Sequence, residues 1–172
     1  MIDRYSLPSM RALWTTQHKY DTWLQVELFA CDAMAAEGLI PHAAAETIRA
    51  RARVDIGRID ELERTSQHDV LAFVNAVADT IGPEGRYLHE GLTSSDVLDT
   101  ALAVVLREAT AILRDDLTRL GVVIRELAHR HRGTIMIGRS HGVHGEPITF
   151  GLKMAVWYDE VGRHRRRLEE AE

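Results

Sequence analysis

The sequence has few of the features that mark secreted or membrane proteins. Cys31 is its single cysteine, so an internal disulfide is excluded, and we expect a small core residue there. No apolar stretch approaches the roughly 18 residues that span a bilayer. Residues 1–4 also lack the basic start and apolar run of a signal peptide. We therefore expect a cytoplasmic protein with no membrane partner.

An excess of positive charge is absent as well. The formal net charge is -5. The basic run at 163–167 is followed directly by the segment 168–172, which contains three glutamates. Mixed charges at helical spacing favour a solvated helix face with intrahelical ion pairs over a nucleic-acid patch. We expect no nucleic-acid partner.

Proline and strand-like alternation are also scarce. The 172 residues include only 4 prolines and 12 glycines, and these lie mostly between segments of helical periodicity. A chain of this length with 45% hydrophobic residues can bury one core, or a small domain plus part of another. We predict an all-α fold. A small N-terminal helical domain at 1–92 is expected to precede the first long antiparallel helices of an oligomeric helical bundle at 93–172.

The N-terminal part predicts several helices. Apolar residues recur at helical spacing through a first long helix: Trp14, Leu24, Leu28, Cys31 and Ala35. Gly38 can end that helix in the left-handed conformation, and Pro41 can start the next. Residues 48–62 predict one or two short helices, and 69–81 a further one, with a polar connection at 64–68.

A much longer helix is expected from Thr93. Apolar residues continue in three- and four-residue steps until Gly133 without a proline, which corresponds to about 55 Å of helix. A lone helix of that length cannot bury its apolar stripe, so neighbouring helices or subunits must cover it. A second helix is expected from Pro147, a residue type favoured in a first turn. Its pattern shows no end before residue 172, as in a truncated chain.

Histidines lie in three loop-like segments beside small polar residues. They are His68, His89, and the pair His141 and His144. Since an unperturbed histidine has a pKa of about 6.5, a loop histidine held by rigid helices is a candidate acid or base. Each one alone is more often a capping or surface residue. Their clustering makes them candidates here.

The turn at 138–147 has a second interpretation as a zinc site. His141, His144 and Glu146 are suitable ligand types. No cysteine is near, however, and no helical histidine pair encloses a glutamate. The three glycines of the turn indicate instead a close backbone approach or positive φ. We expect no metal and no cofactor.

The residues Thr93, Ser94 and Ser95 also allow two interpretations. One hydroxyl is enough to cap the long helix. Three hydroxyls beside free N–H groups at the positive end of a helix dipole could in addition bind a carboxylate or phosphate. These residues alone leave the two interpretations open.

Four segments together resemble the fumarase and aspartase superfamily and, within it, the adenylosuccinate lyase family. They are Arg4-Tyr5-Ser6, residues 65–70, residues 91–97 and the turn at 138–147. Their spacing extends the resemblance over the whole chain. The first segment, combined with the histidine turn, favours the adenylosuccinate branch.

The resemblance implies a β-elimination without a cofactor in a homotetramer. Its substrates would be adenylosuccinate, split into AMP and fumarate, and the succinylated aminoimidazole carboxamide ribotide of purine biosynthesis. By matching position it implies the following roles: His141 as general acid with His68 in support; Thr93 and Ser94 on a succinyl carboxylate; Arg4 and Tyr5 on the nucleotide; Gln67 and Asp69 lining the pocket; His89 near the phosphate.

One departure from the family pattern matters. The flexible loop with the serine base and a substrate-binding lysine would lie beyond residue 172, so we expect the isolated chain to be inactive. Two alternatives account for part of the pattern. A sibling such as argininosuccinate lyase or a cycloisomerase would keep the histidine turn, but Arg4-Tyr5 argues against it. A helical oligomerisation module would explain the long helix but not the three histidine segments.

Overall fold

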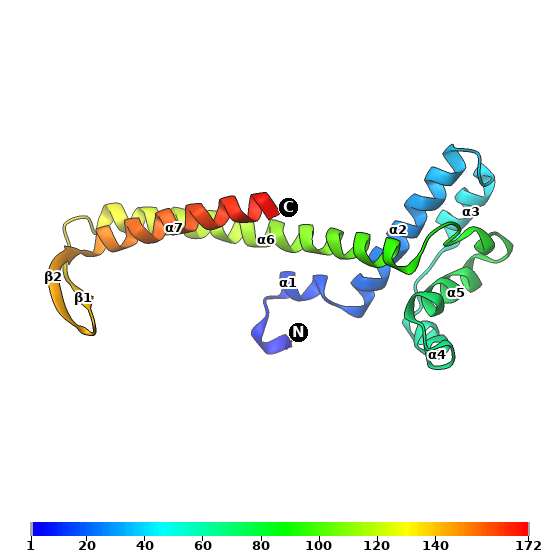
Figure 1. The fold of residues 1–172 in the computed structure, drawn as a ribbon, viewed down its shortest axis with the longest axis horizontal. Coiled ribbons are helices and arrows are strands. Elements are labelled where there is room, and N and C mark those ends of the chain that lie inside the picture. The colour runs from blue at the N-terminus through cyan, green and yellow to red at the C-terminus, as the bar shows by residue number, and fades with distance from the viewer. Residues whose placement is uncertain (1, 172) are drawn as a thin grey trace. The chain divides into compact units, whose positions relative to one another are not determined.

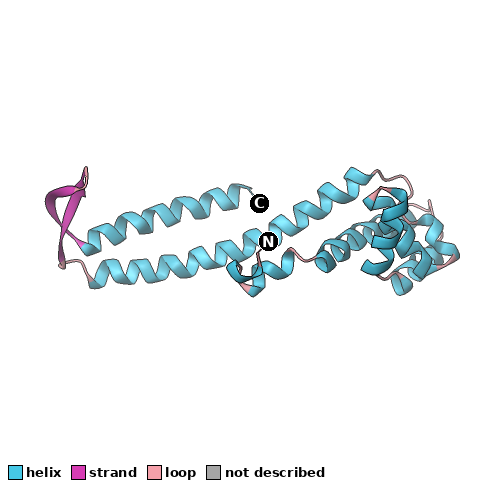
Figure 2. Ribbon diagram, turned by 90° about the horizontal axis from the view of Figure 1, so that it is seen from below, coloured by secondary structure: helices cyan, strands magenta, loops and turns pink. Residues whose placement is uncertain are grey.

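The computed structural model describes residues 2–171, which form seven α-helices, two 3-10 helices and one antiparallel two-stranded sheet (Figures 1 and 2). In chain order the elements are η1 (Asp3–Tyr5), α1 (Pro8–Leu13), α2 (Thr16–Ala36), α3 (His42–Arg51), α4 (Ile56–Ser66), α5 (Asp69–Ile81), η2 (Pro83–Tyr87), α6 (Ser94–Arg130), β1 (Ile135–Ser140), β2 (Val143–Thr149) and α7 (Phe150–Ala171). The predicted all-α class is confirmed. Within the described range, no helix combines the length and apolarity needed to cross a membrane.

The chain divides into two compact units, Met1–Leu106 and Arg107–Glu172. The first unit is built around one face of α2. The residues of α2 that are buried along this face are Tyr20, Trp23, Glu27, Cys31 and Ala35. Their steps of three and four residues place them on a single stripe. Against this stripe pack residues of α3, α4, α5 and the first turns of α6, so the unit has one continuous core.

Three aromatic rings form the centre of that core. Tyr20 and Phe73 are stacked, with ring centroids 5.8 Å apart. Trp23 stands edge-on to both, at 5.2 Å from Tyr20 and 5.4 Å from Phe73. Edge-to-face and offset-stacked contacts are the favoured aromatic geometries, and Phe73 is fully buried. These rings therefore join α2 to α5.

Two helix boundaries in the first unit differ from the prediction. The first long helix does not include Trp14, because α1 ends at Leu13 and α2 begins at Thr16. Thr15 caps α2, its hydroxyl accepting from the N–H of His18 at 3.1 Å. The polar connection at 64–68 is also shorter than predicted, since α4 continues through Ser66. Polarity alone does not break a helix that can keep its backbone bonds.

Other predicted boundaries are confirmed. Gly38 follows α2 with φ +72°, the left-handed conformation expected of it. Cys31 is buried at 1% exposure, as expected of a small core residue. The helix predicted at 69–81 is α5, and it is followed by Gly82 with φ +93°. At 48–62 the chain forms the end of α3 and the start of α4.

The long helix α6 has 37 residues, or about 55 Å at 1.5 Å per residue. Val97 and Ala101 near its start belong to the core of the first unit. Apolar side chains farther along stay about half exposed: Leu102, Leu106, Leu113, Leu120 and Val123. Within residues 2–171 this stripe is only partly covered, as the sequence pattern predicted.

In the second unit α7 runs antiparallel to the C-terminal half of α6 (Figures 1 and 2). Ile124 of α6 packs with Met154 and Val161 of α7 in a small core. At Gly151 the two backbones approach so closely that a Cβ there would lie 2.5 Å from the carbonyl oxygen of Ala128. Only glycine permits this contact without movement of the backbone.

The segment between α6 and α7 corrects a prediction. We expected a turn followed by a helix from Pro147, but Pro147 lies in β2 opposite Ile137, and α7 begins at Phe150. Most of the hairpin is exposed, so its strands carry none of the apolar alternation that identifies a half-buried strand. Proline is acceptable in a two-stranded ribbon because each strand has a free edge.

The basic run on α7 forms the intrahelical pairs that its spacing predicted. Arg163 pairs with Asp159, and Arg165 lies 3.9 Å from Glu169, both at a separation of four residues. Exposed pairs of this kind contribute little to stability. The run is thus a solvated helix face.

We expect Phe73→Ala to lower the free energy of unfolding by about 3–5 kcal/mol, because it empties the centre of the aromatic cluster. Chemical denaturation followed by far-ultraviolet circular dichroism measures this. Leu39→Ala is the matched control, since Leu39 is 73% exposed. Its effect should stay within about 0.5 kcal/mol. Equal losses for the two variants would contradict the assignment of Phe73 to the core.

Cys31 provides a second prediction. Burial raises the pKa of its thiol to about 11 from 9.0, and the negative charge of Glu27 acts in the same direction. Because the thiolate is the reactive form, the folded protein should resist a disulfide reagent at mildly alkaline pH and react quickly once unfolded. The folded state favours the neutral thiol, so this contribution to stability is present below pH 9.0 and is lost as pH rises toward about 11. Rapid labelling of the folded protein would contradict this.

Candidate functional site

The first histidine segment is a sharp turn between α4 and α5. Gln67 has φ +53° and ends α4, its N–H donating to the carbonyl of Glu63 at 2.8 Å. His68 is the N-cap of α5, and its Nδ1 accepts from the N–H of Leu71 at 3.3 Å. Half of the His68 side chain is exposed. With Nδ1 held by the backbone, Nε2 is the ring nitrogen left for a ligand.

The neighbours of His68 are held by local bonds. The side-chain amide of Gln67 donates to the carbonyl of Arg64 at 2.9 Å, and Asp69 accepts from the N–H of Val70 at 2.8 Å. Gln67 also lines a polar hollow of about 470 Å³ with three other side chains: Asp60, Glu63 and Arg64. The structure therefore brings Gln67, His68 and Asp69 together in one exposed turn.

The second histidine segment follows η2. His89 has φ +63° and is bound twice by Glu27. One oxygen of Glu27 accepts from the backbone N–H of His89 at 2.9 Å, and the other lies 2.6 Å from its Nδ1. Glu27 is completely buried, whereas the His89 side chain is 23% exposed. A buried carboxylate thus holds the His89 ring at Nδ1.

The start of α6 is capped by the residues that the sequence singled out. The hydroxyl of Thr93 accepts from the N–H of Ser95 at 3.4 Å, and Asp96 accepts from the N–H of Thr93 at 2.7 Å. These two bonds form a variant of the capping box, with aspartate in the third helical position and the Thr93 hydroxyl bonded one residue earlier, at Ser95. Ser94 is half-buried and is the first residue of α6. The capping interpretation is confirmed, and an additional anion site stays a prediction.

Arg4 and Tyr5 lie in η1. The Arg4 guanidinium carbon is 4.8 Å from the centroid of the Tyr5 ring, within the range of a cation–π contact. Tyr5 is 73% exposed. Both side chains are accessible for a contact with a ligand, and the Ser6 hydroxyl holds the end of η1 by donating to the carbonyl of Asp3 at 3.1 Å.

His141 lies in the second unit, at the tip of the hairpin. Ser140 pairs with Val143, so His141 and Gly142 alone form the connection, with φ of +52° and +76°. A two-residue loop with both φ values positive is a type I′ turn, the form that matches the twist of two antiparallel strands. The His141 side chain is exposed.

The other glycines of the hairpin permit a bulge. The strand register shifts between Ile137 and Arg139. A Cβ at Gly138 would lie 3.0 Å from the carbonyl oxygen of Glu146, and one at Gly145 would lie 3.3 Å from the carbonyl oxygen of Gly138. The sequence prediction of close backbone approach is confirmed at this bulge.

Backbone conformation links the three histidine segments. Among residues 2–171 the non-glycine residues with positive φ are Gln67, His89 and His141. Each lies in a different histidine segment. Such conformations cost energy in residues with a side chain, and they concentrate at functional sites.

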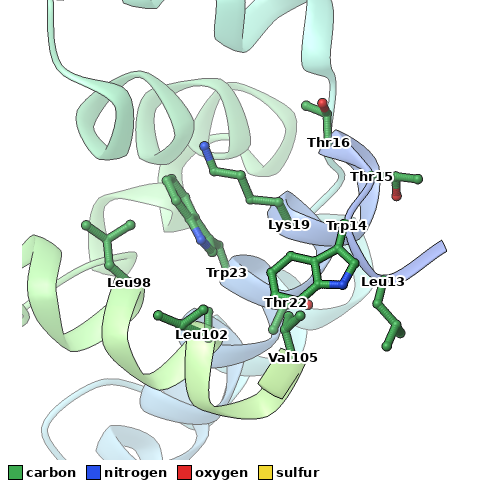
Figure 3. A pocket seen from close by; sticks show the side chains of 11 residues that line it. Leu13, Trp14, Thr15, Thr16, Lys19, Thr22, Trp23, Leu98, Leu102 and Val105 are labelled. Carbon is green, nitrogen blue, oxygen red and sulfur yellow. The ribbon is translucent and has the colours of Figure 1, made fainter. Parts of the chain in front are cut away.

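The apolar hollow of the first unit is a separate feature (Figure 3). It has a volume of about 280 Å³ and lies between α2 and the first turns of α6, lined mainly by Trp14, Trp23, Leu98, Leu102 and Val105. None of the predicted site residues lines it. Lys19, whose ammonium lies 4.4 Å from the centroid of a Trp23 ring, is its charged member. In the part of the chain that the structure describes, no three His, Cys, Asp or Glu side chains are grouped for a metal ion.

The sequence reasoning missed Glu27. It lies four residues before Cys31 on the stripe of α2 that faces the core. A carboxylate at an apolar position of a helical pattern was the available signal, because a charge is rarely buried without a partner.

Comparison with known proteins relates the chain to lyases. A sequence model of the family described as "Lyase" matches residues 4–172. Adenylosuccinate lyase of Bacillus subtilis (strain 168) is 47% identical over 171 residues, which are 99% of this chain and 40% of that protein. Adenylosuccinate lyase of Synechocystis sp. is 51% identical over 168 residues, 98% of this chain and 39% of that protein. The chain therefore spans about 40% of the length of these curated relatives.

A solved structure is similar to this chain over nearly its whole length. The 3-carboxy-cis,cis-muconate lactonizing enzyme from Pseudomonas putida matches with a TM-score of 0.90 at 32% identity. The match covers 96% of this chain and 40% of that one. The fold of this chain is thus similar to that of part of a known enzyme.

We expect Asp96→Ala to lower the free energy of unfolding by about 1 kcal/mol, because the N–H of Thr93 loses its acceptor in the capping box. Asp99→Ala removes the same charge one turn later, and it should have a smaller effect. Thermal and chemical denaturation of both variants measure the difference. Equal losses would mean that Asp96 acts only through its charge near the helix terminus.

Proposed function

The chain belongs to the lyase family, and from that premise we propose that the whole protein splits adenylosuccinate into AMP and fumarate. Membership confirms the family resemblance that the four sequence motifs carried. The observation that supports this substrate is the 47–51% identity to two adenylosuccinate lyases over nearly the whole chain. The succinylated aminoimidazole carboxamide ribotide of purine biosynthesis is proposed as a second substrate.

The reaction is a β-elimination that needs three kinds of group. A base removes a proton from the carbon next to a carboxylate, the carbon–nitrogen bond breaks, and an acid protonates the departing nitrogen. We assign the acid to His141, with His68 in support. The base belongs to a part of the whole protein outside these 172 residues. Fixed donors must also hold the carboxylates as negative charge develops, a role we assign to Thr93 and Ser94.

The remaining contacts are assigned to exposed side chains of the first unit. Arg4 and Tyr5 would hold the nucleotide, Gln67 and Asp69 would line the pocket, and His89 would contact the phosphate. The geometry supports this because each of the three histidine segments contains a non-glycine residue with positive φ, and such backbone conformations concentrate at functional sites. Helices α4 and α5 adjoin the turn of His68, η2 and α6 flank the segment of His89, and the paired strands β1 and β2 hold the turn of His141. These elements supply the rigid support that precise catalytic geometry requires.

The alternatives have less support. The lactonizing enzyme has the same fold, but its identity to this chain is 32%, against 47% and 51% for the two adenylosuccinate lyases. A shared fold alone does not imply a shared reaction. A purely structural helical module would have no use for strained histidine turns.

Assembly and cellular location are part of the same proposal. The half-exposed apolar stripe of α6 supports a homo-oligomer, and we propose a tetramer. The division into an N-terminal domain at 1–92 and a bundle domain from 93 is also proposed. The start of α6 at Ser94 supports it, although the first turns of α6 pack in the core of the first unit, which extends to Leu106. We propose that the whole protein acts in the cytoplasm, needs no cofactor and binds neither nucleic acid nor membrane.

In the whole protein, His141→Ala should lower kcat for adenylosuccinate by about 10²–10⁴-fold, the usual contribution of a general acid. Arg4→Ala should act mainly on binding and raise KM by about ten-fold, as the loss of a charged contact does. Steady-state kinetics and calorimetry with AMP separate the two effects.

His144→Ala is the control, because His144 is an exposed histidine on the same hairpin. It should leave kcat within about three-fold of the unmodified protein, as a surface residue without a role would. If the whole protein neither cleaves adenylosuccinate nor binds AMP, the proposed function is wrong.

A further inference from the structure

Glu27 has a feature that its place in the core does not explain. Its side chain is 0% exposed, among the apolar residues of the α2 stripe. Burying a carboxylate costs free energy even when it is paired, and an apolar side chain of similar volume is often as stable or more so. Packing alone would therefore favour leucine or methionine at this position.

Within residues 2–171, all side-chain hydrogen bonds of Glu27 go to one residue. One carboxylate oxygen accepts a hydrogen bond from the backbone N–H of His89 at 2.9 Å. The other oxygen is hydrogen-bonded to Nδ1 of the His89 ring at 2.6 Å. The first bond holds the backbone, which has φ +63° there, and the second holds the ring. A single rigid helix thus determines both the position and the rotation of His89.

The segment around His89 is anchored to the same face of α2. Cys31, one turn after Glu27, lies with its Sγ 3.8 Å from the carbonyl oxygen of Tyr87, and Leu88 is buried in the core. These contacts already fix the chain before His89. The bond from Glu27 to Nδ1 is additional, and it acts only on the imidazole.

The bond also decides which ring nitrogen can serve a ligand. Because Glu27 occupies Nδ1, contact with a ligand is left to Nε2, on the far side of the ring. When the ring carries both protons, Nδ1–H is donated to Glu27 and Nε2–H can be donated to an anionic oxygen. The side chain is 23% exposed, so solvent reaches part of the ring.

We propose that Glu27 is a positioning residue that presents Nε2 of His89 to the phosphate of the bound nucleotide. This rests on the proposed function for the placement of His89 at the phosphate. Glu27 itself would touch no substrate atom. Its effect should therefore be confined to ligands that carry a phosphate.

The test compares AMP with adenosine as inhibitors of the whole protein. Glu27→Gln should weaken inhibition by AMP about ten-fold, the scale of one charge-assisted hydrogen bond, and leave inhibition by adenosine within about two-fold. KM for adenylosuccinate should rise by a similar factor, while kcat changes less. Glu37→Gln is the matched control, because Glu37 is exposed just after the end of α2. An equal weakening of AMP and adenosine, or no weakening of either, would overturn the proposal.

A second measurement does not depend on catalysis. Diethyl pyrocarbonate modifies accessible histidine nitrogens, and peptide mass mapping reports the modification of His89. Inorganic phosphate should protect His89 in the unmodified protein and in Glu37→Gln, but not in Glu27→Gln. If adenylosuccinate is not cleaved, the proposed function fails, and this measurement still decides the role of Glu27. Protection that is absent, or unchanged by Glu27→Gln, overturns it.

Glu27→Asp serves if Glu27→Gln does not fold, as judged by circular dichroism. It keeps the charge but shortens the side chain by one methylene, so the carboxylate no longer reaches both His89 groups in the same geometry. Affinity for AMP should fall and affinity for adenosine should not. A parallel loss of both affinities would assign Glu27 a structural role only and refute positioning.

Discussion

Packing along one face of α2 is the constraint on which the first unit depends. Toward the N-terminal end of that face, Tyr20 and Trp23 contact Phe73 and so join α2 to α5. Farther along the same face, Glu27 and Cys31 contact the segment from Tyr87 to His89. Because all four residues lie on one stripe of a rigid helix, the aromatic core and the His89 turn are held in a fixed relation to each other.

The histidine turns share a physical design. Gln67, His89 and His141 all adopt the left-handed conformation, which a residue with a side chain adopts only when its surroundings compensate the cost. The compensation differs at each turn. The N–H of Gln67 donates to the carbonyl of Glu63 at the end of α4. His89 is bound by Glu27. His141 is part of a type I′ turn between the paired strands β1 and β2. Each turn therefore presents a polar side chain from a backbone that is not free to rearrange.

Predictions from the sequence succeeded where the signal was local. The start of α6 was predicted because Thr93 and Asp96 cap it through bonds within three residues, and Gly38 was predicted because a left-handed residue after a helix favours glycine. The hairpin was missed because its exposed strands leave no apolar alternation, and Pro147 was misread because a first-turn proline and an edge-strand proline look alike in sequence. The break at Trp14 was missed because the apolar spacing continues across it while the Thr15 cap interrupts the helix.

By itself the sequence determined the helical class, the family, the histidine turns and their glycines, since periodicity, capping residues and short motifs are properties of neighbouring residues. Only the tertiary structure decided which residues distant in the sequence contact each other. Glu27 and His89 are 62 positions apart, and no local pattern pairs them. Their contact exists because core packing brings α2 against the segment that follows η2. A buried carboxylate needs a partner there, and the groups that bond it belong to His89.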